Sequence, residues 1–415
     1  MDELAFLENA SAAFEDIEEN GPSASPLAFD IAFVGLAERV DAAVYNPVTH
    51  DVLEVSNIIY ERHPDGRPPE RAYWVGRKLK KCIFGVVKAC TILKFRNASD
   101  VPWEVTEHKA AVKIMSWQKI RELRHIEDPQ KEVAAMQFVS QDGTHPHVMG
   151  TLDVLQDDEY LLMFMPFCSS GDLFGFVQQA GRFPEPMARY WFKQILEVRQ
   201  HRISKIVVRN GLNYNFTHSF PSLPISFIHQ GLSHLQKMGV CHRDMSLENI
   251  LVDEYKTSVV IDLGMCLRVP YASDDGLVSD VTSGNLRLLM RPLIPCGKPN
   301  YISPEILRSE EPFDGFAIDL WATGVILFIM LVGLPPWEFA RDEDPRYRMV
   351  IRGGLTRMLA SWQRSVSPAA ADLLQRMLME NPRDRLSLCE IKDHPWVLDE
   401  VAAKFDAPVQ EGWRR

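Results

Sequence analysis

The sequence lacks an excess of basic residues. Its 45 lysines and arginines are outnumbered by 56 aspartates and glutamates, which gives a formal net charge of −11 at pH 7. A protein that binds nucleic acid normally shows a basic face, so we exclude nucleic acid as a partner. Small anionic ligands are compatible with this charge, because a nucleotide site needs only a few local donors.

Cysteine is scarce, and none is arranged to bind a metal. The seven cysteines include no C-x-x-C pair and no spacing typical of zinc ligands. Reduced thiols are typical of intracellular proteins. The first residues, MDELAFLENA, are acidic and lack the basic start and apolar run of a signal peptide. We therefore expect an intracellular, cytoplasmic location, with the nucleus as an open alternative.

A hydrophobic run long enough to span a membrane is also missing. A span needs roughly 20 apolar residues. The most apolar segment, Leu320–Leu334, is shorter, starts after Asp319 and stops at Pro335 and Pro336. We predict a buried core helix here and no membrane span.

The chain divides into three parts by composition and periodicity. Residues 1–71, rich in Ala, Asp, Glu, Pro and Ser, are interpreted as a weakly structured acidic arm with one amphipathic helix near Ile31–Val44. Short β-like runs follow, interrupted by a helical stretch at Pro129–Val139, and from about Leu173 helical periodicity dominates. A small β-rich part followed by a larger helical part predicts an α+β fold with two lobes.

Segment 198–230 does not match its surroundings. It contains no Asp, Glu or Ala, and without it ARYWFKQILE runs directly into GLSHLQKMGV. Leu196, Leu232 and Leu235 would then lie on one amphipathic helix. The segment begins with Val, whose codons start with GT, and ends with Gln, which CAG encodes. These are the boundary letters of an unspliced intron, so we hypothesise a retained intron; the alternative is a genuine surface insertion.

Several short motifs follow one another at a consistent spacing. The strongest is His242-Arg243-Asp244-Met245-Ser246-Leu247-Glu248-Asn249, an H-R-D-x-x-x-x-N string. Ala111-Val112-Lys113-Ile114 precedes it, and Asp262-Leu263-Gly264, Ser303-Pro304-Glu305 and the Asp319 motif D-x-W-x-x-G follow it.

These motifs make the chain resemble the eukaryotic protein kinases of serine/threonine type, from about Tyr73 to Trp396. GLPPW at Gly333–Trp337 weakly resembles their calcium/calmodulin-dependent group. The resemblance implies a bilobal kinase domain over residues 72–397, with an N-lobe at 72–165 and a C-lobe at 169–397. Residues 398–415 would form a C-terminal tail.

The resemblance also implies roles for five polar residues in phosphoryl transfer from ATP to a protein hydroxyl. Asp244 would orient the hydroxyl and accept its proton. Lys113, held by Glu132, would neutralise the α- and β-phosphates. Asn249 and Asp262 would hold Mg²⁺. ATP, Mg²⁺ and protein substrates are therefore the expected ligands.

Further positions carry over in the same way. Glu305 and Arg385 would form a buried ion pair that braces the larger lobe. Acidic residues at Asp172 and Glu248 would favour substrates with Arg near the phosphorylated residue. The positions that would surround ATP are Leu79, Gly85, Val87, Ala111, Lys113, Met165, Phe167, Cys168, Asp172 and Leu251.

The chain departs from the family at three places. The mildest is Leu263, which stands where the D-F-G motif of these kinases has phenylalanine and keeps an apolar anchor. The phosphate loop keeps only the third of its three glycines, Gly85, so we expect a weaker nucleotide affinity. Ser246 stands where these kinases carry a lysine, and Lys298 stands where they carry a threonine. We hypothesise that Lys298 reaches Asp244 and the γ-phosphate while Ser246 supplies the hydroxyl, since a lysine is a mobile point charge on a long stem. The alternative is a pseudokinase that binds nucleotide or acts as a scaffold.

Overall fold

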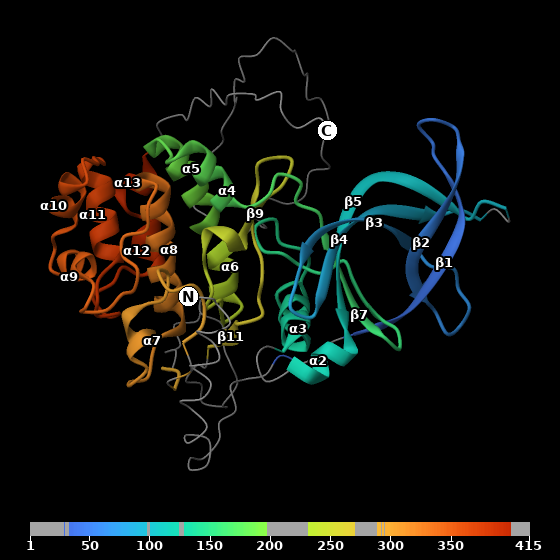
Figure 1. The fold of residues 1–415 in the computed structure, drawn as a ribbon, viewed down its shortest axis with the longest axis horizontal. Coiled ribbons are helices and arrows are strands. Elements are labelled where there is room, and N and C mark those ends of the chain that lie inside the picture. Colours follow the sequence, from blue (N-terminus) through green and yellow to red (C-terminus); the bar gives the residue numbers. More distant parts are fainter. Residues whose placement is uncertain are drawn as a thin grey trace, which may run out of the picture.

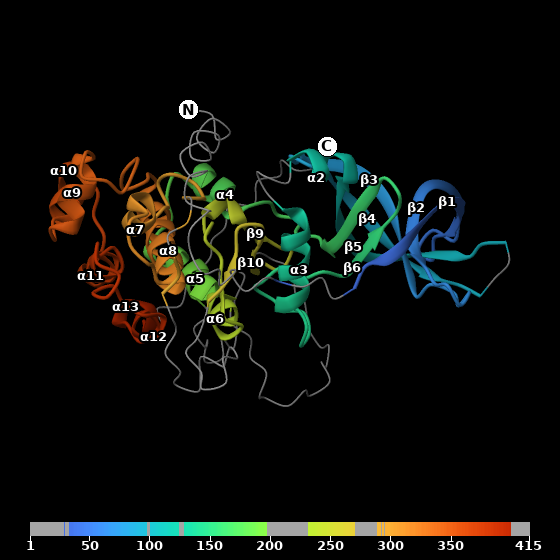
Figure 2. The same cartoon turned by 90° about the horizontal axis from the view of Figure 1, so that it is seen from below.

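The computed structural model describes residues 29, 33–97, 100–123, 128–196, 231–269, 289–291, 293 and 295–399. Within these residues the chain forms two lobes. Figure 1 shows the long strands gathered at one end of the molecule and most helices at the other, and the view from below in Figure 2 agrees. The arrangement matches the predicted α+β, bilobal architecture.

The smaller lobe is built on a sheet with the strand order β1-β2-β3-β4-β5-β7-β6, in which strands next to each other in this order are antiparallel, and β1 also pairs in parallel with β5 and β6. The strands are β1 (Gly35–Tyr45), β2 (Val52–Arg62), β3 (Arg71–Lys81), β4 (Gly85–Phe95), β5 (Trp103–Ser116), β6 (Asp153–Gln156) and β7 (Tyr160–Pro166). Two helices, α2 (Trp117–Leu123) and α3 (Pro129–Val139), follow β5. Asp128 caps α3 by accepting a hydrogen bond from the Gln130 backbone N–H, which satisfies one of the donors left open at a helix start.

Residues 35–62 correct the prediction of a weakly structured N-terminal arm. They form β1 and β2, and β1 covers most of the predicted amphipathic helix. Val44 and Ile58 are fully buried and pack with Ala72, Leu93 and Trp103. The segment is rich in β-branched and aromatic residues, which suit a strand, and pairing within the sheet outweighs its helical pattern. The smaller lobe therefore begins at β1 and not at residue 72, while residues 1–28 lie outside the described part.

The larger lobe is mainly helical. Its helices are α4 (Leu173–Ala180), α5 (Glu185–Leu196), α6 (Gly231–Lys237), α7 (Pro304–Arg308), α8 (Gly315–Val332), α9 (Pro345–Ile351), α10 (Leu355–Ser361), α11 (Pro368–Met377), α12 (Leu388–Lys392) and α13 (Pro395–Leu398). Short elements between α6 and α7 carry the site: β8 (Val240–Cys241), the 3₁₀ helix η1 (Leu247–Asn249), β9 (Ile250–Val252), β10 (Ser258–Val260) and β11 (Leu267–Arg268). The atypical segment 198–230 and most of the tail lie outside the described residues.

Helix α8 is the centre of the larger lobe. Asp314 caps its start by accepting from the backbone N–H groups of Phe316 and Ala317, and Gly333, with φ of 86°, ends it. By length and composition α8 could cross a membrane, but all of its residues are buried inside the protein. This burial agrees with the predicted core helix.

Candidate active site

An ion pair connects the sheet of the smaller lobe to helix α3. The Lys113 ammonium on β5 donates to the Glu132 carboxylate on α3, and the two side chains are only 14% and 5% exposed. Burial raises the pKa of Glu132, the Lys113 ammonium opposes that rise, and the negative charge of Asp262 adds to it. The predicted Lys113–Glu132 pair is therefore present, and Asp262 lies within electrostatic reach of it.

The loop after β8 is anchored by a buried carboxylate. Asp319 on α8 accepts hydrogen bonds from the backbone N–H groups of His242 and Arg243, at 2.6 and 2.9 Å. His242 Nδ1 accepts from the Asp244 N–H at 3.2 Å, so its Nε2 carries the proton shared with the Ile261 carbonyl at 3.0 Å. Arg243 adopts a left-handed backbone, with φ of 67°. These bonds fix the loop that carries Asp244.

Asp244 and Asn249 are joined directly. Asn249 Nδ2 donates to the Asp244 carbonyl at 2.8 Å and to its carboxylate Oδ2 at 2.7 Å. Because the amide nitrogen is committed to Asp244, the Asn249 amide oxygen is left as an acceptor. The other carboxylate oxygen of Asp244, Oδ1, is buried and has no hydrogen-bond partner among the described residues.

Asp262 follows β10 and has a left-handed backbone, with φ of 69°. The preceding Ile261 N–H donates to the Asn249 carbonyl at 2.9 Å, which ties this segment to the loop with Asp244. Leu263, the residue that replaces the family's phenylalanine, is 1% exposed and packs in a cluster with Val133 and Met136 of α3. Leucine therefore serves as the apolar anchor here.

Ser246 and Lys298 lie together beside Asp244. The Lys298 ammonium donates to Ser246 Oγ at 3.0 Å and lies 3.7 Å from Asp244 Oδ2. Ser246 is fully buried, whereas the Lys298 side chain is 24% exposed. The position of Lys298 next to Asp244 agrees with the hypothesis drawn from the sequence.

The predicted ATP positions come from both lobes. Val87 pairs with Lys113 across β4 and β5, and Ala111 pairs with Met165 across β5 and β7. Cys168, Met165 and Leu251 pack against the same apolar cluster as Leu263. Leu79 lies near the end of β3.

Two predicted ATP positions have other contacts. Asp172 accepts from the Gly175 N–H at 2.8 Å and caps α4, so one carboxylate oxygen is already committed. Phe167 lines a surface pocket with Trp74 and Lys109. No described contact places Phe167 against the other residues predicted to surround ATP.

The turn between β3 and β4 differs from an open glycine loop. Cys82 and Gly85 exchange two backbone hydrogen bonds, at 3.0 and 3.2 Å, which leaves Ile83 and Phe84 at the tip. Phe84 is 1% exposed and is buried in the cluster beneath α3, while Ile83 is 43% exposed. A Cβ atom on Gly85 would come 1.9 Å from the Ile114 carbonyl oxygen. The remaining glycine is therefore needed for close packing against β5.

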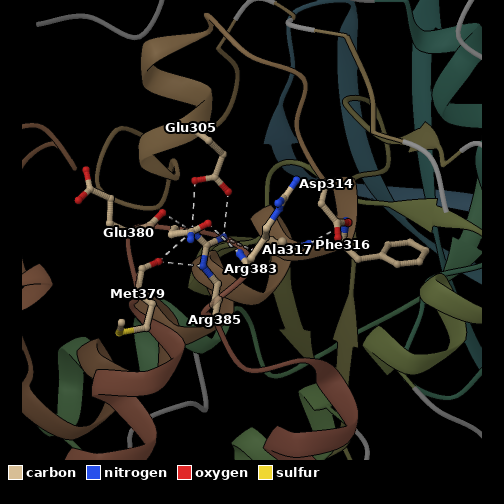
Figure 3. A network of polar contacts seen from close by, with 9 residues as sticks. Glu305, Asp314, Phe316, Ala317, Met379, Glu380, Arg383 and Arg385 are labelled. Atoms are coloured by element: carbon tan, nitrogen blue, oxygen red, sulfur yellow. Dashed lines mark hydrogen bonds and ion pairs between the residues drawn. The ribbon is translucent and has the colours of Figure 1, made fainter. Parts of the chain in front are cut away.

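A second buried ion pair lies behind the site. Arg385 donates to Glu305 at 2.9 and 3.2 Å, to the Ala317 carbonyl at 2.7 Å and to the Met379 carbonyl (Figure 3). Its side chain is 1% exposed, and its guanidinium carbon lies 4.9 Å from the centre of the Trp321 ring. The predicted pair is confirmed, and it joins α7 to the start of α8 and to the loop after α11.

Sequence reasoning missed two contributions to this site. The role of Asp319 as the anchor of the Asp244 loop was unassigned, although a carboxylate within an apolar helix must find partners when buried. The burial of Phe84 could not be predicted, because two adjacent apolar residues at a turn do not indicate which of their side chains points into the core.

Comparison with known proteins gives a family and several relatives. The model of the family described as "Protein kinase domain" matches residues 99–209 and 215–397. CBL-interacting protein kinase 1 of Oryza sativa subsp. japonica is 28% identical over 324 residues, covering 78% of this chain and 55% of that protein.

Two further relatives are similar in the same way. Calcium-dependent protein kinase 8 of Arabidopsis thaliana is 28% identical over 337 residues, 81% of this chain and 51% of that protein. Serine/threonine-protein kinase SAPK9 of Oryza sativa subsp. japonica is 31% identical over 262 residues, 62% of this chain and 58% of that protein. The chain thus spans about half the length of the curated relatives it matches. The name of SAPK9 agrees with the serine/threonine type that the sequence resembles, and the name of calcium-dependent protein kinase 8 agrees with the weak resemblance to the calcium/calmodulin-dependent group.

Proposed function

The chain belongs to the protein kinase family, and from this premise we propose that it transfers the γ-phosphate of ATP to serine or threonine hydroxyls of proteins. The observation that carries the proposal is the convergence of five polar residues. Lys113 is paired with Glu132, and Asn249 is hydrogen bonded to Asp244. The negative charge of Asp262 raises the pKa of Glu132. The neighbouring Ile261 N–H donates a hydrogen bond to the Asn249 carbonyl.

Each of these groups suits a part of the reaction. Phosphoryl transfer depends mainly on positioning and on stabilising charge. Asp244 is the proposed base for the substrate hydroxyl, since its carboxylate is held by Asn249 and its loop is fixed by Asp319. Lys113 is the proposed partner of the α- and β-phosphates, because Glu132 keeps its ammonium in place.

Asn249 and Asp262 fit a magnesium ion by their chemistry. The amide oxygen left open on Asn249 and the Asp262 carboxylate are the oxygen donors that Mg²⁺ prefers. Within the described ranges there is no cluster of three His, Cys, Asp or Glu side chains that could hold a metal alone. The ion would therefore depend on the phosphate oxygens of ATP, and it would neutralise charge on them when bound.

Substrate preference and location extend the proposal. Glu248 accepts a 3.5 Å hydrogen bond from the Tyr301 hydroxyl, and its carboxylate supports a preference for substrates with Arg near the phosphorylated residue. All seven cysteines are free thiols, which supports a reducing, cytoplasmic location.

The test is γ-phosphate transfer to a basic peptide and to the protein itself, with Asp244→Asn as the blank. We expect Mg²⁺-dependent transfer by the full chain that Asp244→Asn reduces to background. A pseudokinase is the second candidate, because Lys80 and Cys82 stand where the family carries the first two glycines of the phosphate loop. Transfer no higher than the blank, from folded protein that binds ATP, would establish that second candidate instead.

A further inference from the structure

The contact between Lys298 and Ser246 has a consequence for how the reaction is controlled. The two residues lie on different parts of the larger lobe. Ser246 precedes η1 on the loop that carries Asp244, whereas Lys298 lies in the 296–301 segment that leads to α7. Their hydrogen bond, at 3.0 Å, therefore joins two segments that are far apart in sequence.

Among the described residues, Lys298 is the cation that pairs with Asp244. The Lys113 ammonium is held by Glu132, and Arg243 donates to the Met265 carbonyl at 3.3 Å. The Lys298 ammonium lies 3.7 Å from Asp244 Oδ2. Of its three N–H donors, the hydrogen bond to Ser246 uses one, and 3.7 Å is too long for a good bond to the carboxylate. A donor on Lys298 is thus available to a phosphate oxygen beside Asp244.

The 296–301 segment is seated against the same carboxylate. Gly297 has φ of 93°, and a Cβ atom there would come 3.0 Å from Asp244 Oδ1. The Tyr301 N–H donates to the Lys298 carbonyl at 2.9 Å. Trp337, which is fully buried, donates from Nε1 to the Asn300 carbonyl at 3.2 Å. Lys298 therefore keeps its place only while this segment packs against the loop and Trp337.

We infer that Lys298 is the catalytic cation for the transferred phosphate, that Ser246 holds it in position, and that seating of the 296–301 segment is consequently required for the chemical step. In that step the substrate oxygen bonds to the γ-phosphorus while the bond to the bridging oxygen of ADP breaks. The hydroxyl proton goes to Asp244, and Lys298 balances the negative charge on the phosphoryl oxygens. The inference rests on the proposed kinase function.

The first test replaces the ammonium and keeps the stem. Lys298→Met is expected to lower kcat by about 100-fold, as for removal of one donor to a reacting oxyanion, with little change in the KM for ATP. Lys94→Ala, which removes an exposed lysine on β4, is the matched control and should keep wild-type kcat. A Lys298→Met kcat within twofold of wild type overturns the inference. Wild-type transfer no higher than Asp244→Asn instead overturns the proposed function, so the two failures are distinguishable.

The second test moves the lysine to the loop. Lys298→Thr alone should lose kcat to a similar extent, and Ser246→Lys combined with Lys298→Thr should recover it to within about tenfold of wild type. The double variant also decides the matter if Lys298→Met fails to fold. Its kcat above that of Lys298→Thr supports the inference, and an equal kcat overturns it.

The third test asks whether packing of the 296–301 segment against Trp337 is needed to position Lys298. Trp337→Phe keeps an aromatic ring against Trp321 and removes the hydrogen bond to Asn300; the smaller ring also leaves a cavity, whose effect is the same in both backgrounds. It should lower kcat several-fold in the wild type but not in the Ser246→Lys/Lys298→Thr background, where the lysine no longer depends on the segment. An equal loss in both backgrounds contradicts the coupling.

Discussion

Asp319 couples the folding of helix α8 to the loop that carries Asp244. Burial raises the pKa of this carboxyl to about 6, although hydrogen bonds from His242 and Arg243 oppose the rise. The charged form is thus costly inside the lobe, and the two backbone donors offset part of that cost. The same bonds orient Asp244, so the position of the proposed base depends on a residue that has no contact with substrate.

The raised pKa of Asp319 predicts a pH dependence of stability. The folded protein holds this proton up to about pH 6, whereas the ordinary value is 3.8. Protonation of Asp319 therefore contributes fully to the free energy of unfolding below pH 3.8, and this contribution is lost as the pH rises through 6. Asp319→Asn removes the titration. Between pH 4 and pH 7 the free energy of unfolding of the wild type should fall relative to Asp319→Asn by up to about 3 kcal/mol.

Urea denaturation of both proteins across this pH range provides the measurement. The difference between them isolates Asp319 from other groups that titrate in the same interval. A difference that stays constant from pH 4 to pH 7 would show that the carboxyl has an ordinary pKa.

The same substitution in two arginine ion pairs should lower the unfolding free energy by very different amounts. Arg385→Ala removes the ion-pair partner of the Glu305 carboxylate and the hydrogen bonds to the Ala317 and Met379 carbonyls, so it should cost about 3–5 kcal/mol of unfolding free energy. Arg308 is 46% exposed and pairs with Glu380 at the surface. Arg308→Ala should therefore cost no more than about 1 kcal/mol. Equal losses in chemical denaturation would contradict the assignment of Arg385 as a buried brace.

At the scale of elements, α5 and α6 have the geometry of one helix. When residues 198–230 are not counted, Leu196 is the fourth residue before Ser233, and Ser233 Oγ donates to the Leu196 carbonyl at 3.4 Å. A Cβ atom on Gly231 would lie 2.9 and 3.2 Å from the carbonyl oxygens of Ile195 and Gln194, the third and fourth residues before it on the same count. Separations of three and four residues are those that bring successive turns of one α-helix together, and the 2.9 Å approach to Ile195 is too close for a residue with a Cβ atom.

Deletion of residues 198–230 should therefore leave a folded protein. We expect the midpoint of thermal unfolding to stay the same or rise, because the helix no longer has to be closed across an inserted segment. Replacing the segment with a glycine–serine linker of equal length is the matched control. A deletion variant that loses the cooperative transition would favour a structural insertion over a retained intron, and sequencing of the mature transcript decides its origin.

The β3–β4 turn makes a prediction of its own. Phe84→Ala should lower the unfolding free energy by about 3–5 kcal/mol, since the ring is buried under α3. Ile83→Ala, one residue away and 43% exposed, should change it by less than about 0.5 kcal/mol. Chemical denaturation measures both. Similar effects from the two variants would mean that Phe84 lies over the phosphates and not in the core.

At the scale of the whole molecule, the proposed ligand contacts come from both lobes. Lys113 and Val87 lie in the smaller lobe, and Asp244, Asn249 and Asp262 lie in the larger one. A nucleotide held by both sets stabilises the native protein by mass action, about 2.7 kcal/mol at 100 times its dissociation constant.

We therefore expect Mg²⁺ and ATP together to raise the midpoint of thermal unfolding, and EDTA to remove most of that shift. Asp262→Asn should retain the shift seen with ATP alone and lose the additional part due to Mg²⁺. A magnesium-dependent shift of equal size in Asp262→Asn would exclude this carboxylate as a ligand.

Local sequence determined much of this protein. The H-R-D string, the Lys113 strand and the Asp262 motif predicted the kinase family and a bilobal fold, because each depends on a few residues at fixed short spacing. The Glu305–Arg385 pair and the core helix α8 were predicted for the same reason, and the contact of Lys298 with Ser246 followed from two substitutions that compensate each other in charge and size.

Only the tertiary structure decided the rest. Residues 35–62 form strands because pairing with β3 and burial of Val44 and Ile58 outweigh the helical pattern of this segment. Phe84 is buried because it joins an apolar cluster that includes Val133 and Met136 of α3. These residues are distant in sequence, so the residues next to Phe84 do not predict its burial. Asp319 acquired its role because burial makes a carboxylate accept any available donor, and those donors come from a loop far away in sequence. Such contacts depend on which distant segments of the chain pack together, and the sequence of one segment alone does not predict this.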